Sequence, residues 1–101
     1  MSLLRIQQKD SYRGDNYWDW SVWLEGPASE LDQIKYVEYR LHPTFPNPVR
    51  RVADRKSQFK LSSAGWGGFT IYAKVIFRDG SLHSIDYPLR LYRPVEEPAS
   101  R

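Results

Sequence analysis

The stretch YWDWSVWLE, residues 17–25, decides the fold. Its even-numbered residues are large and apolar, whereas the polar residues Asp19, Ser21 and Glu25 stand at odd positions. Successive side chains of a strand point to opposite faces, so this alternation predicts a strand with one face buried and the other in water. Gly26-Pro27 follows directly and predicts the end of the strand.

The same period of two residues recurs along the chain. It predicts strands at residues 4–8, 17–25, 33–41, 57–61, 69–77 and 83–91. In the short fourth strand, Phe59 and Leu61 should point inward. No long window has a period of 3.6 residues, and only residues 29–33 are expected to form one helical turn, with Ser29 as its N-cap. Short strands separated by turn signals predict an all-β domain of the β-sandwich class.

The last two strands carry the clearest hairpin signal. Asp79-Gly80 stands between them and should supply the positive φ angles of a tight turn. Pro88 lies within the second strand and has no N–H to donate to a ladder. We therefore expect this strand to lie at a sheet edge or to contain a bulge.

Length and composition predict one small domain. The 101 residues include 15% aromatic residues and no cysteine, so the core is expected to depend on packing, with no disulfide and no thiolate metal site. Residues 1–93 are assigned to the domain, and residues 94–101, rich in Pro, Glu and Ser, to a flexible tail or linker. The N-terminus lacks a signal-peptide pattern and no segment is long enough to span a bilayer, so we expect a cytoplasmic protein, or a nuclear one in a eukaryote.

No catalytic motif is present in the sequence. We find no metal-binding histidine pair, glycine-rich phosphate loop or serine nucleophile elbow, and His83 is expected to be structural. The prediction is a protein that is no enzyme and has no catalytic residue, no metal and no cofactor.

Two segments predicted as loops are unusually rich in proline, glycine and aromatic residues. In HPTFPNPVR, residues 42–50, three prolines stiffen the backbone and hold His42 and Phe45 at low entropic cost. In GWGGF, residues 65–69, the glycines allow close backbone approach to a ligand and leave Trp66 with little side-chain cover. A single loop aromatic usually caps the core, but two of them beside a histidine and a threonine hydroxyl favour a recognition site.

These segments resemble the motifs of the YEATS domain. HPTFPNPVR is similar to the family pattern H-x-[ST]-F-x-x-P-x-R, and GWGGF to G-[WY]-[GA]-x-F. WSVWLEG, residues 20–26, resembles the early W-x-V-x-[VL]-x-G strand. The motifs occur in the family's order over about residues 17–92, and the short hairpin is similar to the prokaryotic branch.

The resemblance implies an immunoglobulin-like β-sandwich that binds acylated lysine in an extended peptide. Phe45 and Trp66 would be the walls on either side of the flat acyl-amide, and His42 would buttress the pocket. Thr44 would hydrogen-bond the amide through its hydroxyl, and the backbone N–H of Trp66, flanked by glycines, would donate to the acyl carbonyl. The implied ligand-binding residues are His42, Thr44, Phe45, Gly65, Trp66 and Gly67, with Tyr17 or Trp18 as a further pocket aromatic.

Physical chemistry is consistent with that assignment. A neutral planar amide can stack on aromatic rings, whereas a charged lysine would lose several kcal/mol of solvation in the same slot. A cage for methyl-lysine is a competing idea, but a histidine and a threonine suit an amide better.

Two other functions remain open from the sequence. One is a structural or protein-interaction domain of a bacterial signalling or membrane-associated protein, which would bind another protein partner. The other is nucleic-acid binding through Arg50, Arg51, Arg55 and Lys56, which we interpret as a solvated loop because Asp54 interrupts the cluster. The sequence does not indicate an oligomeric state.

Overall fold

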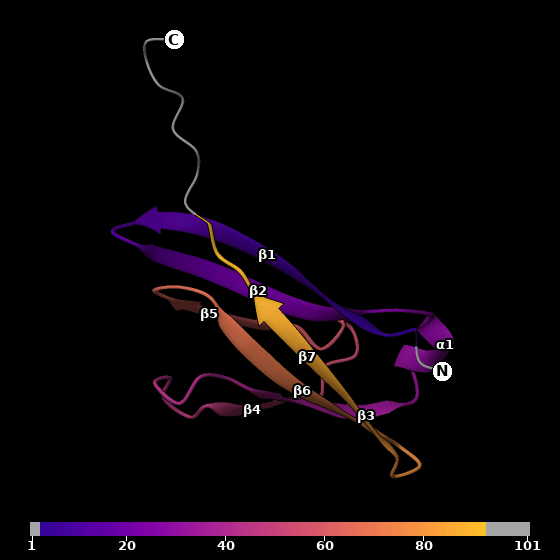
Figure 1. Ribbon diagram of the computed structural model, residues 1–101. Helices are drawn as coiled ribbons and strands as arrows, with labels where there is room; N and C mark the ends of the chain where they lie inside the picture. Colours follow the sequence, from indigo (N-terminus) through magenta and orange to yellow (C-terminus); the bar gives the residue numbers. More distant parts are fainter. Residues whose placement is uncertain (1–2, 93–101) are drawn as a thin grey trace.

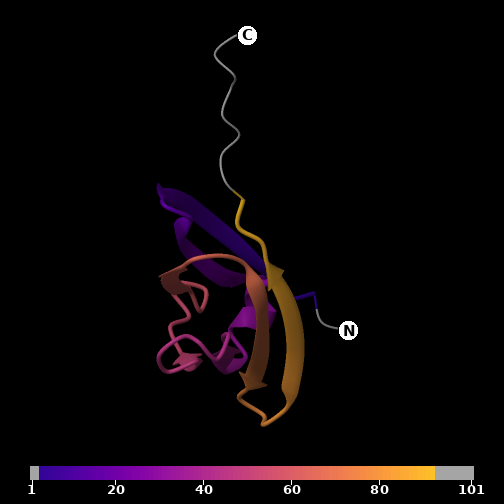
Figure 2. The same cartoon turned by 60° about the vertical axis from the view of Figure 1, so that its left-hand side comes forward.

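Seven strands and one short helix form residues 3–92, the part of the chain that the computed structural model describes. In chain order they are β1 (Arg5–Gly14), β2 (Tyr17–Glu25), α1 (Ala28–Leu31), β3 (Ile34–Arg40), β4 (Val49–Val52), β5 (Leu61–Gly65), β6 (Phe69–Phe77) and β7 (Leu82–Leu89). The strands make a three-stranded sheet in the order β1-β2-β5 and a four-stranded sheet in the order β4-β3-β6-β7. Every pairing is antiparallel, and the two sheets form two layers (Figures 1 and 2). The predicted all-β sandwich is therefore confirmed.

The core lies between the two sheets and is built by alternation. On β2, Trp18, Trp20, Val22 and Leu24 are buried, and the residues between them are not. The facing four-stranded sheet contributes Val37 and Tyr39 from β3 and Ile71, Ala73 and Val75 from β6. The strand predicted at residues 17–25 has those bounds in the structure.

The predicted hairpin is present as β6 and β7, and its turn differs from the expected one. Phe77 N–H donates to Ser81 O at 2.9 Å, and Gly80 N–H donates to Phe77 O at 3.0 Å. Only Gly80 has a positive φ, of 90°, so Asp79 does not share the left-handed region. This bonding pattern is that of a three-residue loop with glycine in the last position, not a two-residue turn. Pro88 lies on β7, an edge strand, as predicted.

The strand predicted at residues 57–61 is wrong. Gln58 and Phe59 have φ angles of 59° and 58°, in the left-handed region, and the chain turns there so that Phe59 N–H reaches Asp54 O at 2.9 Å. Phe59 nevertheless points inward and is fully buried. The strand begins only at Leu61 and continues to Gly65, because residues 61–65 pair with β2. The tight turn gains a buried phenylalanine at the cost of two strained backbone positions.

Other predicted boundaries also change. β1 is longer than residues 4–8, and the four-residue strand β4 was not predicted. In α1, Pro27 occupies the N-cap position and its carbonyl accepts from Glu30 N and Leu31 N, so Ser29 is not the cap. The predicted tail, residues 94–101, lies outside the described residues, and so does the domain boundary at residue 93.

Two loops leave the sandwich at the same end, and this arrangement positions the site. The loop after β3 begins beyond Arg40, which pairs with Tyr72 close to the start of β6. The loop from β5 to β6 crosses from the three-stranded sheet to the four-stranded sheet. Gly68 in this crossing packs against β7, where any Cβ would collide with the carbonyl oxygen of Leu89. The start of β6 is thereby fixed close to the first loop.

A buried hydrogen bond joins the 54–60 turn to the core. The hydroxyl of Tyr39 donates to Phe59 O at 2.6 Å, and burial raises the pKa of this tyrosine well above its ordinary value. The bond satisfies the carbonyl of a residue whose backbone is strained.

We predict that Tyr39→Phe lowers the free energy of unfolding by about 1–3 kcal/mol, because the buried carbonyl of Phe59 loses its donor. Urea denaturation measures the change. Tyr72→Phe removes an exposed hydroxyl and serves as the matched control, expected to stay within about 0.5 kcal/mol of the parent protein. Equal stability of the two variants would contradict the role of the hydrogen bond.

Candidate functional site

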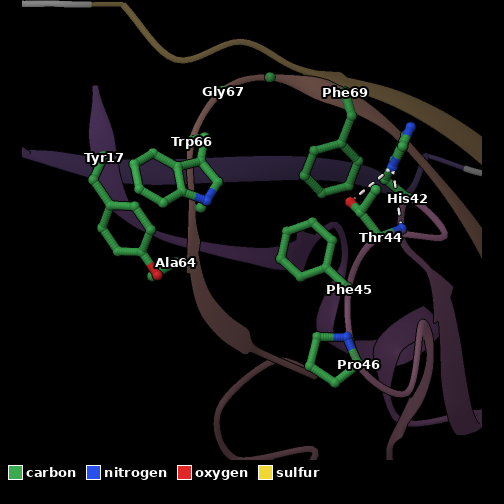
Figure 3. Close-up of a pocket in the computed structure, with 11 residues that line it drawn as sticks. Tyr17, His42, Thr44, Phe45, Pro46, Ala64, Trp66, Gly67 and Phe69 are labelled. Atoms are coloured by element: carbon green, nitrogen blue, oxygen red, sulfur yellow. Dashed lines mark hydrogen bonds between the residues drawn. The ribbon is translucent and has the colours of Figure 1, made fainter. Parts of the chain in front are cut away.

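The two end loops enclose a pocket with a volume of about 480 Å³ (Figure 3). Its lining comes from the start of β2, the β3–β4 loop, and the segment from the end of β5 to the start of β6. The lining residues are Tyr17, His42, Thr44, Phe45, Pro46, Ala64, Gly65, Trp66, Gly67, Gly68 and Phe69. Figure 3 shows Trp66 and Tyr17 on one side, and Phe45 and Phe69 together on the other.

The β3–β4 loop is held closed by backbone acceptors. Leu41 N–H donates to Pro48 O at 2.7 Å, across the base of the loop. The Arg50 guanidinium donates from Nε to Asn47 O and from Nη2 to Pro46 O, both at 3.0 Å. These three bonds and the prolines leave the loop little freedom, as the sequence predicted.

Phe45 is the fixed wall of the pocket. Its ring centroid lies 5.1 Å from that of Phe69 and 6.2 Å from that of buried Trp20. Gly65 makes room for the ring, since a Cβ there would lie 3.2 Å from Phe45 Cζ. Phe45 is half-buried, so it is supported from the core and still lines the pocket.

His42 and Thr44 form a polar pair beside this wall. His42 Nδ1 lies 2.9 Å from Thr44 Oγ1, and Thr44 N–H donates to the same nitrogen at 3.3 Å. A nitrogen that accepts from a backbone N–H carries no proton, so the hydroxyl of Thr44 is the donor in the first contact. The lone pairs of Thr44 Oγ1 are then free to accept a hydrogen bond from a ligand.

Trp66 is the exposed wall. It is 72% exposed, and its ring meets that of Tyr17 edge to face at a centroid distance of 4.8 Å. Trp66 comes directly after Gly65, the last residue of β5 paired with β2, so its backbone N–H lies beyond that ladder. Large apolar side chains are usually covered, and an exposed tryptophan at a pocket is typical of a binding surface.

Seven of the eight predicted ligand-binding residues line this pocket, and Trp18 does not. Trp18 points into the sandwich, where its ring lies 5.0 Å from that of Tyr12 and its Nε1 donates to Tyr92 O at 3.2 Å. Of the two alternatives for the further aromatic, the structure brings Tyr17 to the pocket. Phe69 also lines the pocket but was predicted only as a strand residue, although it is the last residue of the GWGGF motif.

The pocket is lined without a carboxylate. None of its lining residues is an aspartate or a glutamate. Across residues 3–92, no group of three or more His, Cys, Asp or Glu side chains is arranged to hold a metal ion. Among the same residues, no helix has the length and hydrophobicity needed to cross a membrane.

The basic cluster at residues 50–56 differs from the solvated loop that the sequence indicated. Arg50 and Arg51 belong to β4, and Arg51 pairs with Glu38 at 3.3 Å. Arg55 pairs with Asp32 at 2.8 Å. These cations are engaged by the domain itself, which further argues against nucleic-acid binding by the cluster.

Comparison with known proteins gives consistent matches. The family model described as prokaryotic YEATS domain matches residues 18–90. A protein AF-9 homolog from Eremothecium gossypii is 39% identical over 87 residues, covering 81% of this chain and 41% of that protein. One from Saccharomyces cerevisiae is 42% identical over 60 residues, covering 57% of this chain and 26% of that protein. The chain therefore spans less than half the length of these curated relatives.

Solved structures of similar fold include two complexes of the Yaf9 YEATS domain. The one recognising an H3K122suc peptide has a TM-score of 0.67 at 29% identity, covering 91% of this chain and 76% of that one. The one bound to H3K27ac has a TM-score of 0.68 at 28% identity, covering 93% and 77% of the two chains. The YEATS-like sandwich predicted from the sequence is thus confirmed.

The two aromatic walls should contribute differently to stability. We predict that Phe45→Ala lowers the free energy of unfolding by about 2 kcal/mol, because a half-buried ring loses its contacts with Trp20 and Phe69. Trp66→Ala should change it by less than about 0.5 kcal/mol, since the side chain is mostly in water. Urea denaturation of both variants tests this, and a large loss in Trp66→Ala would mean that Trp66 belongs to the core.

Proposed function

The chain belongs to the prokaryotic YEATS domain family, and on that basis we propose that its end-loop pocket binds the side chain of an acylated lysine in a peptide or protein. The observation that carries the proposal is the exposed Trp66 opposite the supported Phe45 in an open pocket. The function is binding without catalysis.

The lining of the pocket favours a neutral, flat group. Aromatic faces of Phe45 and Trp66 provide stacking surfaces, and no carboxylate is present to neutralise an ammonium. A charged lysine would therefore lose several kcal/mol of solvation on entry, and acylation removes this penalty. A methyl-lysine cage is less well supported, because a permanent cation would meet His42 and Thr44 without a countercharge.

The polar pair supplies the specific contact to the amide. The hydroxyl of Thr44 gives its proton to His42 Nδ1 and so presents lone pairs to the pocket. In our proposal the side-chain amide N–H of the acylated lysine donates to Thr44 Oγ1. The acyl carbonyl accepts from the backbone N–H of Trp66, which lies beyond the β2–β5 ladder. Both polar atoms of the ligand would then be satisfied.

The similar structures support the ligand class and leave the natural partner open. The Yaf9 YEATS domain recognises an H3K122suc peptide in one complex and is bound to H3K27ac in the other. We propose the same chemical class here, an acylated-lysine peptide, with no specific protein as its source. A cytoplasmic location, or a nuclear one in a eukaryote, stays a prediction.

The second candidate is a structural or interaction domain that has kept the fold without the ligand. A packed Trp66 and a filled slot would favour that function. The exposed Trp66 and the open pocket favour the reader instead.

Acetyl-lysine and crotonyl-lysine peptides should bind saturably, whereas the same peptide with unmodified lysine should not bind in the millimolar range. Tryptophan fluorescence and backbone amide shifts at Thr44, Phe45 and Trp66 measure the binding. Trp66→Ala should abolish it, and Trp23→Phe, on the outer face of β2, is the control that keeps it. Absence of shifts with any acylated peptide would favour the interaction domain.

The contribution of the Thr44 hydroxyl to binding can be separated from that of the side chain's shape. Thr44→Val should weaken acetyl-lysine binding about tenfold, because the amide N–H enters the pocket without an acceptor. Thr44→Ser keeps the hydroxyl and should stay within about threefold of the parent protein. Isothermal titration of both variants checks the expectation, with far-UV circular dichroism to verify the fold. Equal affinity of the valine variant would show that the ligand does not use this oxygen.

A further inference from the structure

Three arginines lie close to lining residues of the pocket, two of them through their guanidinium groups and one through its backbone. Arg50 Cζ lies 6.0 Å from the ring centroid of Phe45, and Arg13 Cζ lies 5.8 Å from that of Tyr17. The Cα of Arg90 lies 3.4 Å from the position that a Cβ on Gly68 would take. We call Arg13, Arg50 and Arg90 the rim arginines.

The charge of this rim is only partly neutralised. Arg13 pairs with Asp19 at 3.2 Å. Arg50 is bonded to the carbonyls of Pro46 and Asn47 and keeps its full charge. The exposed side chain of Arg90 has no ion pair within residues 3–92.

With no carboxylate in the lining, the mouth of the pocket therefore carries excess positive charge. The whole chain has a formal net charge of +3, so the rim adds to the general field of the protein. A ligand whose own charges are negative close to the acyl-amide would meet a complementary surface. One with lysines and arginines close to the acylated residue would meet repulsion.

We propose that the peptide recognised by this domain carries aspartate or glutamate on either side of its acylated lysine. This inference rests on the proposed function. It narrows the ligand class to acidic acyl-lysine sequences, in contrast to a lysine- and arginine-rich segment.

The position of the charges assigns the carboxylates to the peptide flanks and not to the acyl group. Arg13 and Arg50 lie beside the rings of Tyr17 and Phe45 and are not themselves lining residues. The only titratable groups among the lining residues are His42 and Tyr17. An extended peptide advances about 3.3 Å per residue, so neighbours one or two positions from the lysine lie over the rim while the acyl group occupies the pocket.

The test uses blocked pentapeptides with acetyl-lysine in the centre and Glu, Gln or Lys on both sides. Glu and Gln have the same shape, so their comparison isolates charge. The Glu peptide should bind about fivefold to tenfold more tightly than the Gln peptide, and the Lys peptide at least twofold more weakly. Raising the salt from about 50 to 300 mM should shrink these ratios, because screening shortens the range of exposed charges.

Arg90→Gln tests the rim directly. Lys35→Gln is its matched control, because Lys35 lies at the start of β3, away from the loop that lines the pocket. Both remove one positive charge from an exposed side chain. Arg90→Gln should reduce the Glu-to-Gln ratio about twofold, and Lys35→Gln should leave it unchanged. Arg50 is not used because its hydrogen bonds hold the β3–β4 loop.

The outcomes separate this inference from the proposed function. Equal binding of the Glu and Gln peptides would overturn the inference and leave the acyl-lysine reader intact. A succinyl-lysine peptide with Gln flanks is a further comparison. If succinylation raises the affinity over the acetyl-lysine Gln peptide by more than Glu flanks do, the inference is also overturned, since the favoured carboxylate would then belong to the acyl group. No binding by any acylated peptide would overturn both.

Discussion

The rest of the structure depends on the burial of Trp20 between the two sheets. It is 2% exposed, and its ring lies edge-on to both Phe45 and Phe69. Its indole N–H has no hydrogen-bond acceptor within residues 3–92 and lies close to Gly65, below the pocket. An unpaired buried donor costs about 1–3 kcal/mol, and burial of the large indole ring stabilises the fold by more than this cost. Because one ring contacts both the core and the pocket wall, the position of the wall depends on the packing of the core.

The two walls that result are unlike. Phe45 is backed by the core and held on a loop that three prolines and several internal hydrogen bonds stiffen. Trp66 stands between glycines and contacts only Tyr17 among the rings of the described residues. A ligand therefore meets one wall that is packed against the core and one that is mostly exposed to water. Preorganisation of the first wall reduces the entropic cost of binding.

Much of the fold and most of the site follow from local sequence patterns. β2 and the β6–β7 hairpin are visible in the sequence because one face of each strand is buried. An apolar residue at every second position therefore follows directly from burial. The 54–60 turn was missed because Phe59 and Leu61 are two residues apart and both buried, as they would be on one face of a strand. Phe59 instead reaches the core from a left-handed turn, which tertiary contacts stabilise. β4 was missed because it has only four residues, and the two arginines between its valines leave it without an apolar period. Tyr17 and Trp18 were both candidates because both lie near the start of the early strand, where the resemblance implies a further pocket aromatic. Strand alternation is the reason that only one of these two neighbours can line the pocket.

Pro88 has a consequence for how this domain behaves among other copies of itself. β7 is an edge strand of eight residues, and such an edge offers unpaired backbone groups to any passing chain. Since Thr70 and Pro88 stay in register within the ladder, the ring nitrogen of Pro88 faces away from β6, towards the open edge. An incoming strand would lose a donor there and clash with the pyrrolidine ring. The proline thus interrupts the template for edge-to-edge aggregation, at no cost to the hairpin that carries it.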